Sequence, residues 1–155
     1  MHLLAKTSKV NINNDPEFKP KYEGTNFFKI VPKFIIQGGD ISNNDGTGHF
    51  SIYENEYIED EIKKEVTFCE MGLMALANKG KNTNGSQFFI TLDELQNLDG
   101  QYTIVGRVLK GFDKLKNVSM TCGNIDGEPL CNVKIAKSGI YSYEDYMKLK
   151  NNYLI

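Results

Sequence analysis

Two short stretches of the chain place a glutamine between glycines and large apolar residues. Residues 34–40 read FIIQGGD around Gln37, and residues 82–90 read NTNGSQFFI around Gln87. A side-chain amide can hydrogen-bond to a peptide backbone, and neighbouring apolar side chains can enclose an apolar group. The two stretches together therefore predict a site that binds a peptide. Either stretch alone is also typical of a core strand that ends in a turn.

The elements that carry these glutamines are predicted to be short strands of an antiparallel sheet, closed or sandwiched. Apolar runs separated by glycine-containing turns lie at residues 27–31, 34–37, 73–77, 88–91, 102–108 and 133–136. Residues 111–118 repeat apolar side chains at helical spacing and predict a short helix against the sheet. Ser142, followed by acidic residues, predicts the start of another helix. The acidic segment 54–65 predicts a solvated surface, and residues 3–6 predict the tail of a further helix.

The composition bounds the fold and excludes several functions. With 155 residues and 40% hydrophobic content, we expect one globular domain. A net charge of −2 offers no basic surface for a nucleic acid, and no apolar run reaches the ~20 residues of a membrane span. We expect a monomeric protein of the cytoplasm or nucleus. Cys69, Cys122 and Cys131 lack the close spacing of a zinc site or a redox pair, so we expect reduced thiols.

Longer motifs around both glutamines resemble the cyclophilin family of prolyl cis/trans isomerases. The active face of that family carries FHR-x-x-PGF-x-x-QGGD and AN-x-G-x-NTNGSQFFI. This chain reads FFKIVPKFIIQGGD at residues 27–40 and ANKGKNTNGSQFFI at residues 77–90. The resemblance extends from about Tyr22 to Ile140 through DGTG at 45–48, SIY at 51–53, LDGQYTIVGRV at 98–108 and VKIA at 133–136.

The resemblance implies a mainly β fold, an eight-stranded antiparallel β-barrel capped by two helices. The first two strands of that fold and most of its first helix would precede the point where this chain begins. The expected cyclophilin-like domain, residues 1–141, is therefore N-terminally incomplete. Residues 142–155 lie beyond the last strand of the family and are expected to form a C-terminal helical extension.

The resemblance also implies an activity, the rotation of X-Pro peptide bonds in aid of protein folding, with no metal and no cofactor. Its partners would be proline-containing peptides and proteins. The catalytic residues it implies are Lys29, Phe34, Gln37 and Asn78. The substrate-binding residues it implies are Ile35, Ala77, Lys79, Gln87, Phe89, Asn97, Leu98 and Tyr102. Of these residues, Phe34, Ile35, Phe89 and Leu98 would form the proline pocket. The resemblance also implies a shallower neighbouring pocket, bordered by Lys79, Lys81, Thr83, Asn84 and Gly85.

The chain departs from the family pattern at positions of this site. Lys29 stands where the family has arginine, and Phe28 replaces the preceding histidine. Arginine offers a planar fork that can reach the prolyl nitrogen and a neighbouring glutamine together, whereas lysine offers a compact charge on a flexible stem. We therefore expect slower catalysis. Asn97 replaces a tryptophan and lacks its indole N–H and apolar face, so cyclosporin is expected to bind weakly. Tyr102 replaces a histidine, and its ring can still wall the pocket.

The chain lacks the motifs of two other functions. A phosphate-binding P-loop requires lysine and then serine or threonine after its second glycine, and Ser86 followed by Gln87 does not meet that requirement. His2 and His49 lie in no motif that pairs them with a serine nucleophile. The alternative that stays open is a noncatalytic module that binds proline peptides within a larger assembly, such as a spliceosomal one.

Overall fold

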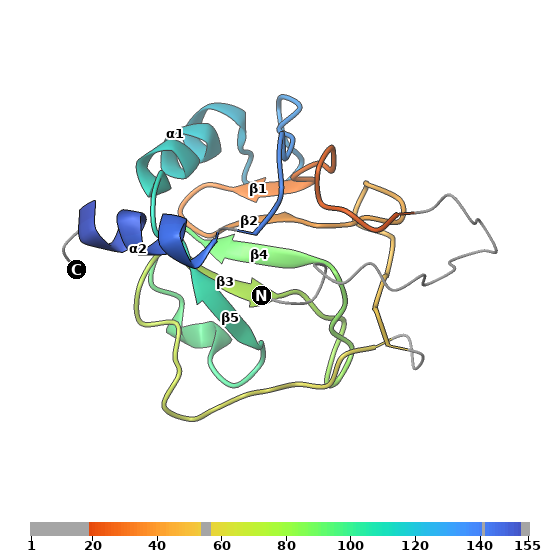
Figure 1. Ribbon diagram of the computed structural model, residues 1–155. Helices are drawn as coiled ribbons and strands as arrows, with labels where there is room; N and C mark the ends of the chain where they lie inside the picture. The colour runs from red at the N-terminus through yellow and green to blue at the C-terminus, as the bar shows by residue number, and fades with distance from the viewer. Residues whose placement is uncertain (1–18, 54–56, 141, 153–155) are drawn as a thin grey trace.

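The computed structural model describes residues 19–53, 57–140 and 142–152, and its centre is one antiparallel β-sheet (Figure 1). The strands follow the order β1-β2-β4-β3-β5. Their bounds are β1 Lys29–Val31, β2 Ile35–Gly38, β3 Leu73–Leu76, β4 Phe88–Thr91 and β5 Ile104–Arg107. Within the described residues β1 and β5 are the outer strands, so this sheet is open. The mainly β, antiparallel class expected from the sequence is confirmed.

Apolar side chains on both faces bury the central strands. β4 is buried at all four positions and β2 at three of its four. Because both faces are covered, these strands read as nearly continuous apolar runs instead of alternating with polar residues. One face carries a core cluster of Ile35, Phe68, Leu73, Ala75, Phe89 and Leu95. The opposite face carries a second cluster of Ile30, Ile36 and Leu92.

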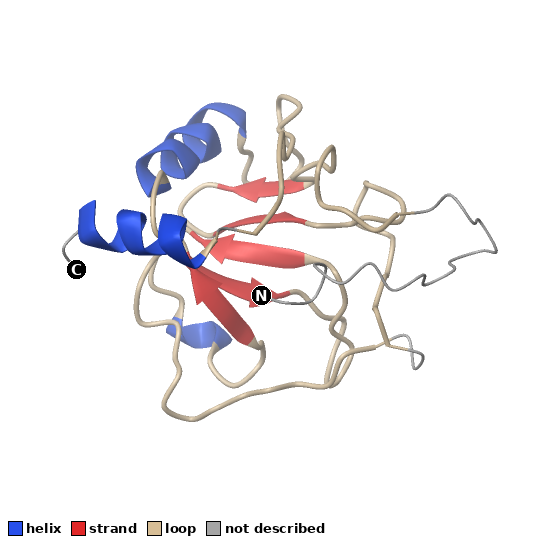
Figure 2. Cartoon of the chain, in the orientation of Figure 1, coloured by secondary structure: helices blue, strands red, loops and turns tan. Residues whose placement is uncertain are grey.

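Two α-helices lie toward one end of the sheet, on the left of Figure 2. α1 (Phe112–Cys122) packs Phe112, Leu115 and Val118 against the second cluster, which confirms the helix predicted from their spacing. α2 (Tyr143–Asn152) follows Ser142, whose hydroxyl accepts a hydrogen bond from the Asp145 N–H at 3.1 Å and so caps the helix as predicted. No helix among the described residues is long and apolar enough to cross a membrane.

The sixth predicted strand, residues 133–136, is wrong in extent. Only Lys134 forms a bridge, to Asn26. Backbone hydrogen bonds flank it, from the Phe27 N–H to the Val133 carbonyl at 2.8 Å and from the Ile135 N–H to the Thr25 carbonyl at 2.9 Å. The pairing stops because the facing chain turns at once: the Thr25 N–H donates back to the Tyr22 carbonyl at 3.0 Å.

Two further predictions concern loops and termini. Residues 57–65, the described part of the acidic segment, are mainly exposed, as predicted. The helix tail predicted at residues 3–6 lies outside the described residues.

The expectation of three reduced cysteines is also wrong. Cys122 and Cys131 form a disulfide with their Cα atoms 5.2 Å apart, whereas Cys69 is free and exposed. After the end of α1 the chain turns back on itself, and the Leu130 N–H donates to the Cys122 carbonyl at 2.7 Å. This return brings together two cysteines whose spacing in the sequence resembles no redox motif.

Candidate active site

The register of the sheet places Lys29, Gln37 and Phe89 in one row. Lys29 of β1 lies directly opposite Gln37 of β2, and Gln37 lies opposite Phe89 of β4. Directly paired residues point their side chains to the same face of a sheet. An exposed lysine, a half-buried amide and a buried ring therefore follow one another across this face. Three residues selected from the sequence are thus brought together.

A hydrogen bond joins the two glutamines. Gln37 Nε2 donates to Gln87 Oε1 at 3.1 Å. Gln87 Nε2 in turn donates to the carbonyls of Gly46 at 3.1 Å and Gly48 at 2.7 Å. Gln87 is therefore tied both to β2 and to the loop of residues 40–48, and it holds the Gln37 amide in a fixed orientation beside Lys29.

Asp40 organises the loop that anchors Gln87. Its carboxylate accepts hydrogen bonds of 2.8 to 3.3 Å from the backbone N–H groups of Ser42, Asn43, Asp45, Gly46 and Gly48. Burial alone raises the pKa of Asp40, but the N–H groups of Asn43, Gly48, Gly46 and Ser42 lower it below the usual value. The sequence analysis gave Asp40 no role. An aspartate before a run rich in asparagine and glycine is the signal that predicts such a turn.

All four residues of the predicted proline pocket belong to the first core cluster. Phe89 and Ile35 are buried at its base, with 3% and 6% of their surface exposed. The half-buried side chains packed around them are Phe34, Ala77, Leu98, Tyr102 and Ile104. The Tyr102 ring meets the Phe89 ring edge to face, with centroids 5.1 Å apart. The cluster thus offers an apolar base with a partly exposed rim.

One member of this cluster was missed from the sequence. Phe68 stacks on Phe89 with centroids 6.0 Å apart and is almost fully buried. It follows shortly after the acidic segment 54–65, which is predicted to be a solvated surface. A lone aromatic residue just beyond such a segment is the signal that marks it as a core anchor.

Asn78 and Lys79 lie on a more polar pocket beside the apolar cluster. This pocket of about 800 Å³ is lined by Asp60, Ile62, Asn78, Lys79, Gly80, Lys81, Asn82, Gly100, Gln101 and Tyr102. Asn78 Nδ2 donates to the Gln101 carbonyl at 3.0 Å, and this bond ties two of its loops together. Lys79 and Lys81 are exposed. Because Tyr102 belongs to both regions, a peptide on the apolar cluster would continue into this pocket.

Asn97 belongs to a different element from the strands that carry Lys29, Gln37 and Phe89. It is exposed on the 3₁₀-helix η1 (Gln96–Leu98), next to Leu98. Its carbonyl accepts a hydrogen bond from Gln101 Nε2 at 2.7 Å. Its backbone therefore shapes the loop, and its side chain adds no apolar surface to the rim.

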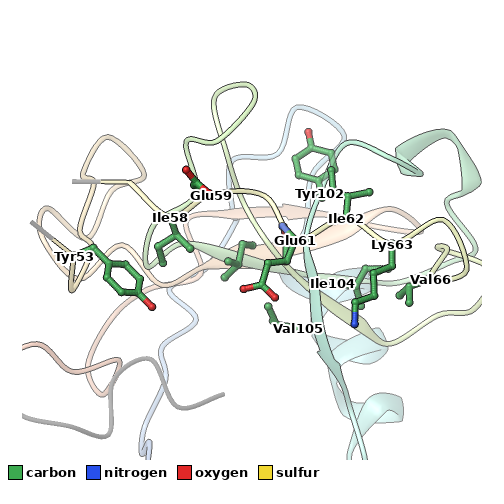
Figure 3. A pocket seen from close by; sticks show the side chains of 12 residues that line it. Tyr53, Ile58, Glu59, Glu61, Ile62, Lys63, Val66, Tyr102, Ile104 and Val105 are labelled. Atoms are coloured by element: carbon green, nitrogen blue, oxygen red, sulfur yellow. The ribbon is translucent and has the colours of Figure 1, made fainter. Parts of the chain in front are cut away.

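A further pocket, of about 390 Å³, opens beside β5 (Figure 3). Its walls come from residues 58–66 and from Tyr102 to Val105, together with Tyr53 and Leu76. Of the residues selected from the sequence only Tyr102 lines it. This pocket is therefore separate from the predicted site and flanks it.

The arrangement supplies a hydrogen-bond donor, two amides and an apolar surface. Lys29 can donate to an atom that gains electron density, Gln37 can hold a peptide backbone in the orientation that Gln87 gives it, and the cluster around Phe89 can take an apolar ring. Among the described residues no group of three or more histidines, cysteines or acids could hold a metal ion. The parts fit noncovalent work on a peptide.

Known proteins resemble this chain in sequence and in fold. The chain matches the family model "Cyclophilin type peptidyl-prolyl cis-trans isomerase/CLD" over residues 4–140. Peptidyl-prolyl cis-trans isomerase-like 1 of Homo sapiens is 44% identical over 117 residues, which are 76% of this chain and 69% of the relative. Peptidyl-prolyl cis-trans isomerase CYP18-2 of Arabidopsis thaliana is 42% identical over 119 residues, covering 77% and 71%.

Solved structures agree with these relatives. A cyclophilin type peptidyl-prolyl cis-trans isomerase of Cryptosporidium parvum superposes with a TM-score of 0.67 at 39% identity, over 74% of this chain and 72% of that one. The same protein in the presence of the dipeptide Ala-Pro gives a TM-score of 0.70 at 39% identity, over 78% and 77%.

Proposed function

Because the chain belongs to the cyclophilin family of peptidyl-prolyl cis-trans isomerases, we propose that it catalyses rotation about X-Pro peptide bonds and so assists protein folding. The observation that carries this proposal is the row of Lys29, Gln37 and Phe89 beside one apolar cluster. An isomerase of this kind needs a donor, an amide and an apolar surface on one face, and this row supplies them.

The task of the site is to lower a barrier of ~18–20 kcal/mol that arises from the partial double bond of the peptide C–N link. The proline ring rests on the cluster of Phe34, Ile35 and Phe89. Gln37, oriented by Gln87, holds the neighbouring backbone, and Asn78 shapes the loop beside it through its bond to the Gln101 carbonyl. Lys29 donates a hydrogen bond to the prolyl nitrogen as its lone pair localises, which stabilises the twisted state more than the planar one. No covalent intermediate and no cofactor is needed.

A related structure supports the class of ligand. A similar structure was solved in the presence of the dipeptide Ala-Pro, and this supports proline-containing peptides as ligands of this chain. The exposed lysines of the polar pocket, Lys79 and Lys81, would meet the residues that precede the proline. We propose that this isomerase is slow for its family because Lys29 replaces the arginine.

The experiment that tests the proposal measures exchange between the cis and trans forms of a proline tetrapeptide by NMR. With catalytic amounts of protein, exchange cross-peaks between the two forms should grow with protein concentration. Lys29→Met should abolish most of this growth while peptide binding persists. Exchange that stays at the uncatalysed rate would contradict the proposal.

A second function is favoured by the two exposed departures, Lys29 and Asn97. A module that only binds proline peptides would need the apolar cluster and the amides but no optimal cation. Binding of the tetrapeptide without any acceleration of exchange would support this module over the enzyme.

A further inference from the structure

The loop closed by the Cys122–Cys131 disulfide runs along the outer edge of β1. The Ile30 N–H donates to the Gly127 carbonyl at 2.9 Å, and the Asn124 N–H donates to the Ile30 carbonyl at 3.0 Å. Both outward backbone groups of the residue next to Lys29 are therefore satisfied by this loop. β1 thus has β2 on one side and the disulfide loop on the other.

Gly127 is a residue of this loop that lies beside the Lys29 side chain. A Cβ atom added to Gly127 would lie 3.1 Å from Lys29 Cγ and 3.3 Å from its Cε. The same glycine has φ +90°, which disfavours other residues. Gly127 is buried although Lys29 is exposed, so the bare backbone of the loop supports the stem of the lysine.

The disulfide fixes the two ends of the loop to each other. Cys122 is the last residue of α1, and Cys131 leads into the segment that pairs Val133 with Phe27. Cys131 is exposed and Cys122 is half-buried, so a dithiol reductant in solution can reach the bond. Opening it removes the covalent link between the ends of the loop and leaves hydrogen bonds, from the Leu130 N–H to the Cys122 carbonyl and between the loop and Ile30.

We propose that Gly127 and the Cys122–Cys131 disulfide form a positioning device for Lys29, and that reduction of this disulfide lowers the isomerase rate. The inference rests on the proposed function. In the reduction a dithiol gives up two electrons and two protons, each cysteine sulfur gains one of each, and the dithiol becomes an intramolecular disulfide. The loosened loop confines the lysine less, while the apolar cluster around Phe89 is untouched.

The expected signature is a fall in kcat at nearly constant KM. Lys29 is proposed to act in the twisted state, whereas ground-state binding depends on the apolar cluster and the glutamines. In NMR exchange with a proline tetrapeptide, kcat should fall about threefold or more on treatment with dithiothreitol, with KM changed less than twofold. Cys131→Ser should show the lower kcat without reductant and no further response to it. Cys69→Ser, which removes the free cysteine, should respond as the unmodified protein does.

A second pair of variants tests Gly127 itself. Gly127→Ala adds the atom that would crowd Lys29, and we expect it to lower kcat at constant KM. Gly24→Ala is the matched control, since Gly24 has φ +87° but nothing within 4 Å of an added Cβ. Equal kcat values for both variants would overturn the role of Gly127.

Amide hydrogen exchange separates this inference from the proposed function. Reduction should speed exchange of the Ile30 amide at least tenfold while the Phe89 amide in β4 stays protected. If reduction causes this change but the oxidised protein has no isomerase activity, the coupling of the disulfide to β1 stands and the proposed function fails. If the Ile30 amide and kcat are both unchanged by dithiothreitol, the inference is wrong.

Discussion

At the scale of single residues, the cationic side chain of Lys29 is expected to affect the proposed isomerisation rate most. Lys29 lies opposite Gln37, which Gln87 holds in place. A lysine presents its three donors from one nitrogen on a flexible stem, whereas the planar guanidinium fork holds its donors in fixed positions that can meet the prolyl nitrogen and the Gln37 oxygen together.

Lys29→Arg should therefore raise kcat/KM for a proline tetrapeptide. A gain of up to ~1.4 kcal/mol in transition-state stabilisation corresponds to about tenfold. The matched control is Lys33→Arg, because Lys33 is exposed in the turn between β1 and β2, and it should leave the rate unchanged. An unchanged rate in Lys29→Arg would show that the fork is not what limits this site.

Asn97 gives a second prediction at this scale. Its exposed side chain adds no apolar face beside Leu98, so we expect weak cyclosporin binding. Asn97→Trp should tighten binding at least tenfold, or ~1.4 kcal/mol, because an indole buries a large apolar area and supplies an N–H donor. Isothermal titration calorimetry measures both, with Gln96→Trp on the same 3₁₀-helix as the control. Tight binding by the unmodified chain would contradict the expectation.

At the scale of elements, the loop of residues 40–48 depends on one carboxylate. The pKa of Asp40 is lowered in the folded protein, so its stabilising effect is present above the unfolded pKa of about 3.9 and is lost as pH falls through the folded value. The loop in turn holds Gln87. Acid should thus affect both stability and the site.

Calorimetric melting curves across pH check this. Asp40→Asn should cost about 2 kcal/mol at pH 7, since buried backbone N–H groups lose a charged acceptor, and should weaken the fall in melting temperature below pH 4. Glu65→Gln, a change on the exposed acidic segment, should leave the curve as it is. If Asp40→Asn left the acid dependence of the melting temperature unaltered, the acid sensitivity would belong to other groups.

The C-terminal helix α2 is predicted to contribute little to the stability of the protein. Ser142 to Asp145 and Lys148 are exposed, and so is Tyr146. Ending the chain after Ile140 should change the melting temperature by about 2 °C or less, as for surface changes in a domain of this size. Leu115→Ala on α1, which packs against the second cluster, should lower stability by about 2 kcal/mol and serves as the contrast.

Elements were predictable from the sequence where one local rule decides them. Residues 88–91 match β4 because an apolar run is bounded by polar neighbours on both sides. The helix predicted at residues 111–118 continues to Cys122 in the structure. The prediction stops early because Ser119 and Thr121 interrupt the apolar spacing on which it is based. The segment 133–136 failed as a strand because the turn at Thr25, far away in the sequence, limits its pairing.

At the scale of the whole molecule, part of the candidate site could be predicted from local motifs, and part depends on contacts between distant segments. Motif residues such as Gln37 and Gln87 were selected together because the motifs are local. The contact of Gly127 with Lys29 and the Cys122–Cys131 bond depend on how distant segments fold back, and no local pattern encodes that. Only the assembled sheet places this loop beside the lysine.

The remaining free side of β5 has a consequence for handling the protein. Within the described residues β5 pairs with β3 alone, and the pocket beside it exposes Ile62 and Val66. The unpaired backbone groups of an edge strand can form hydrogen bonds with a strand of another molecule. Concentrated stocks should therefore slowly turn turbid and bind thioflavin, whereas Val105→Lys, a charge on that margin, should keep them clear for longer.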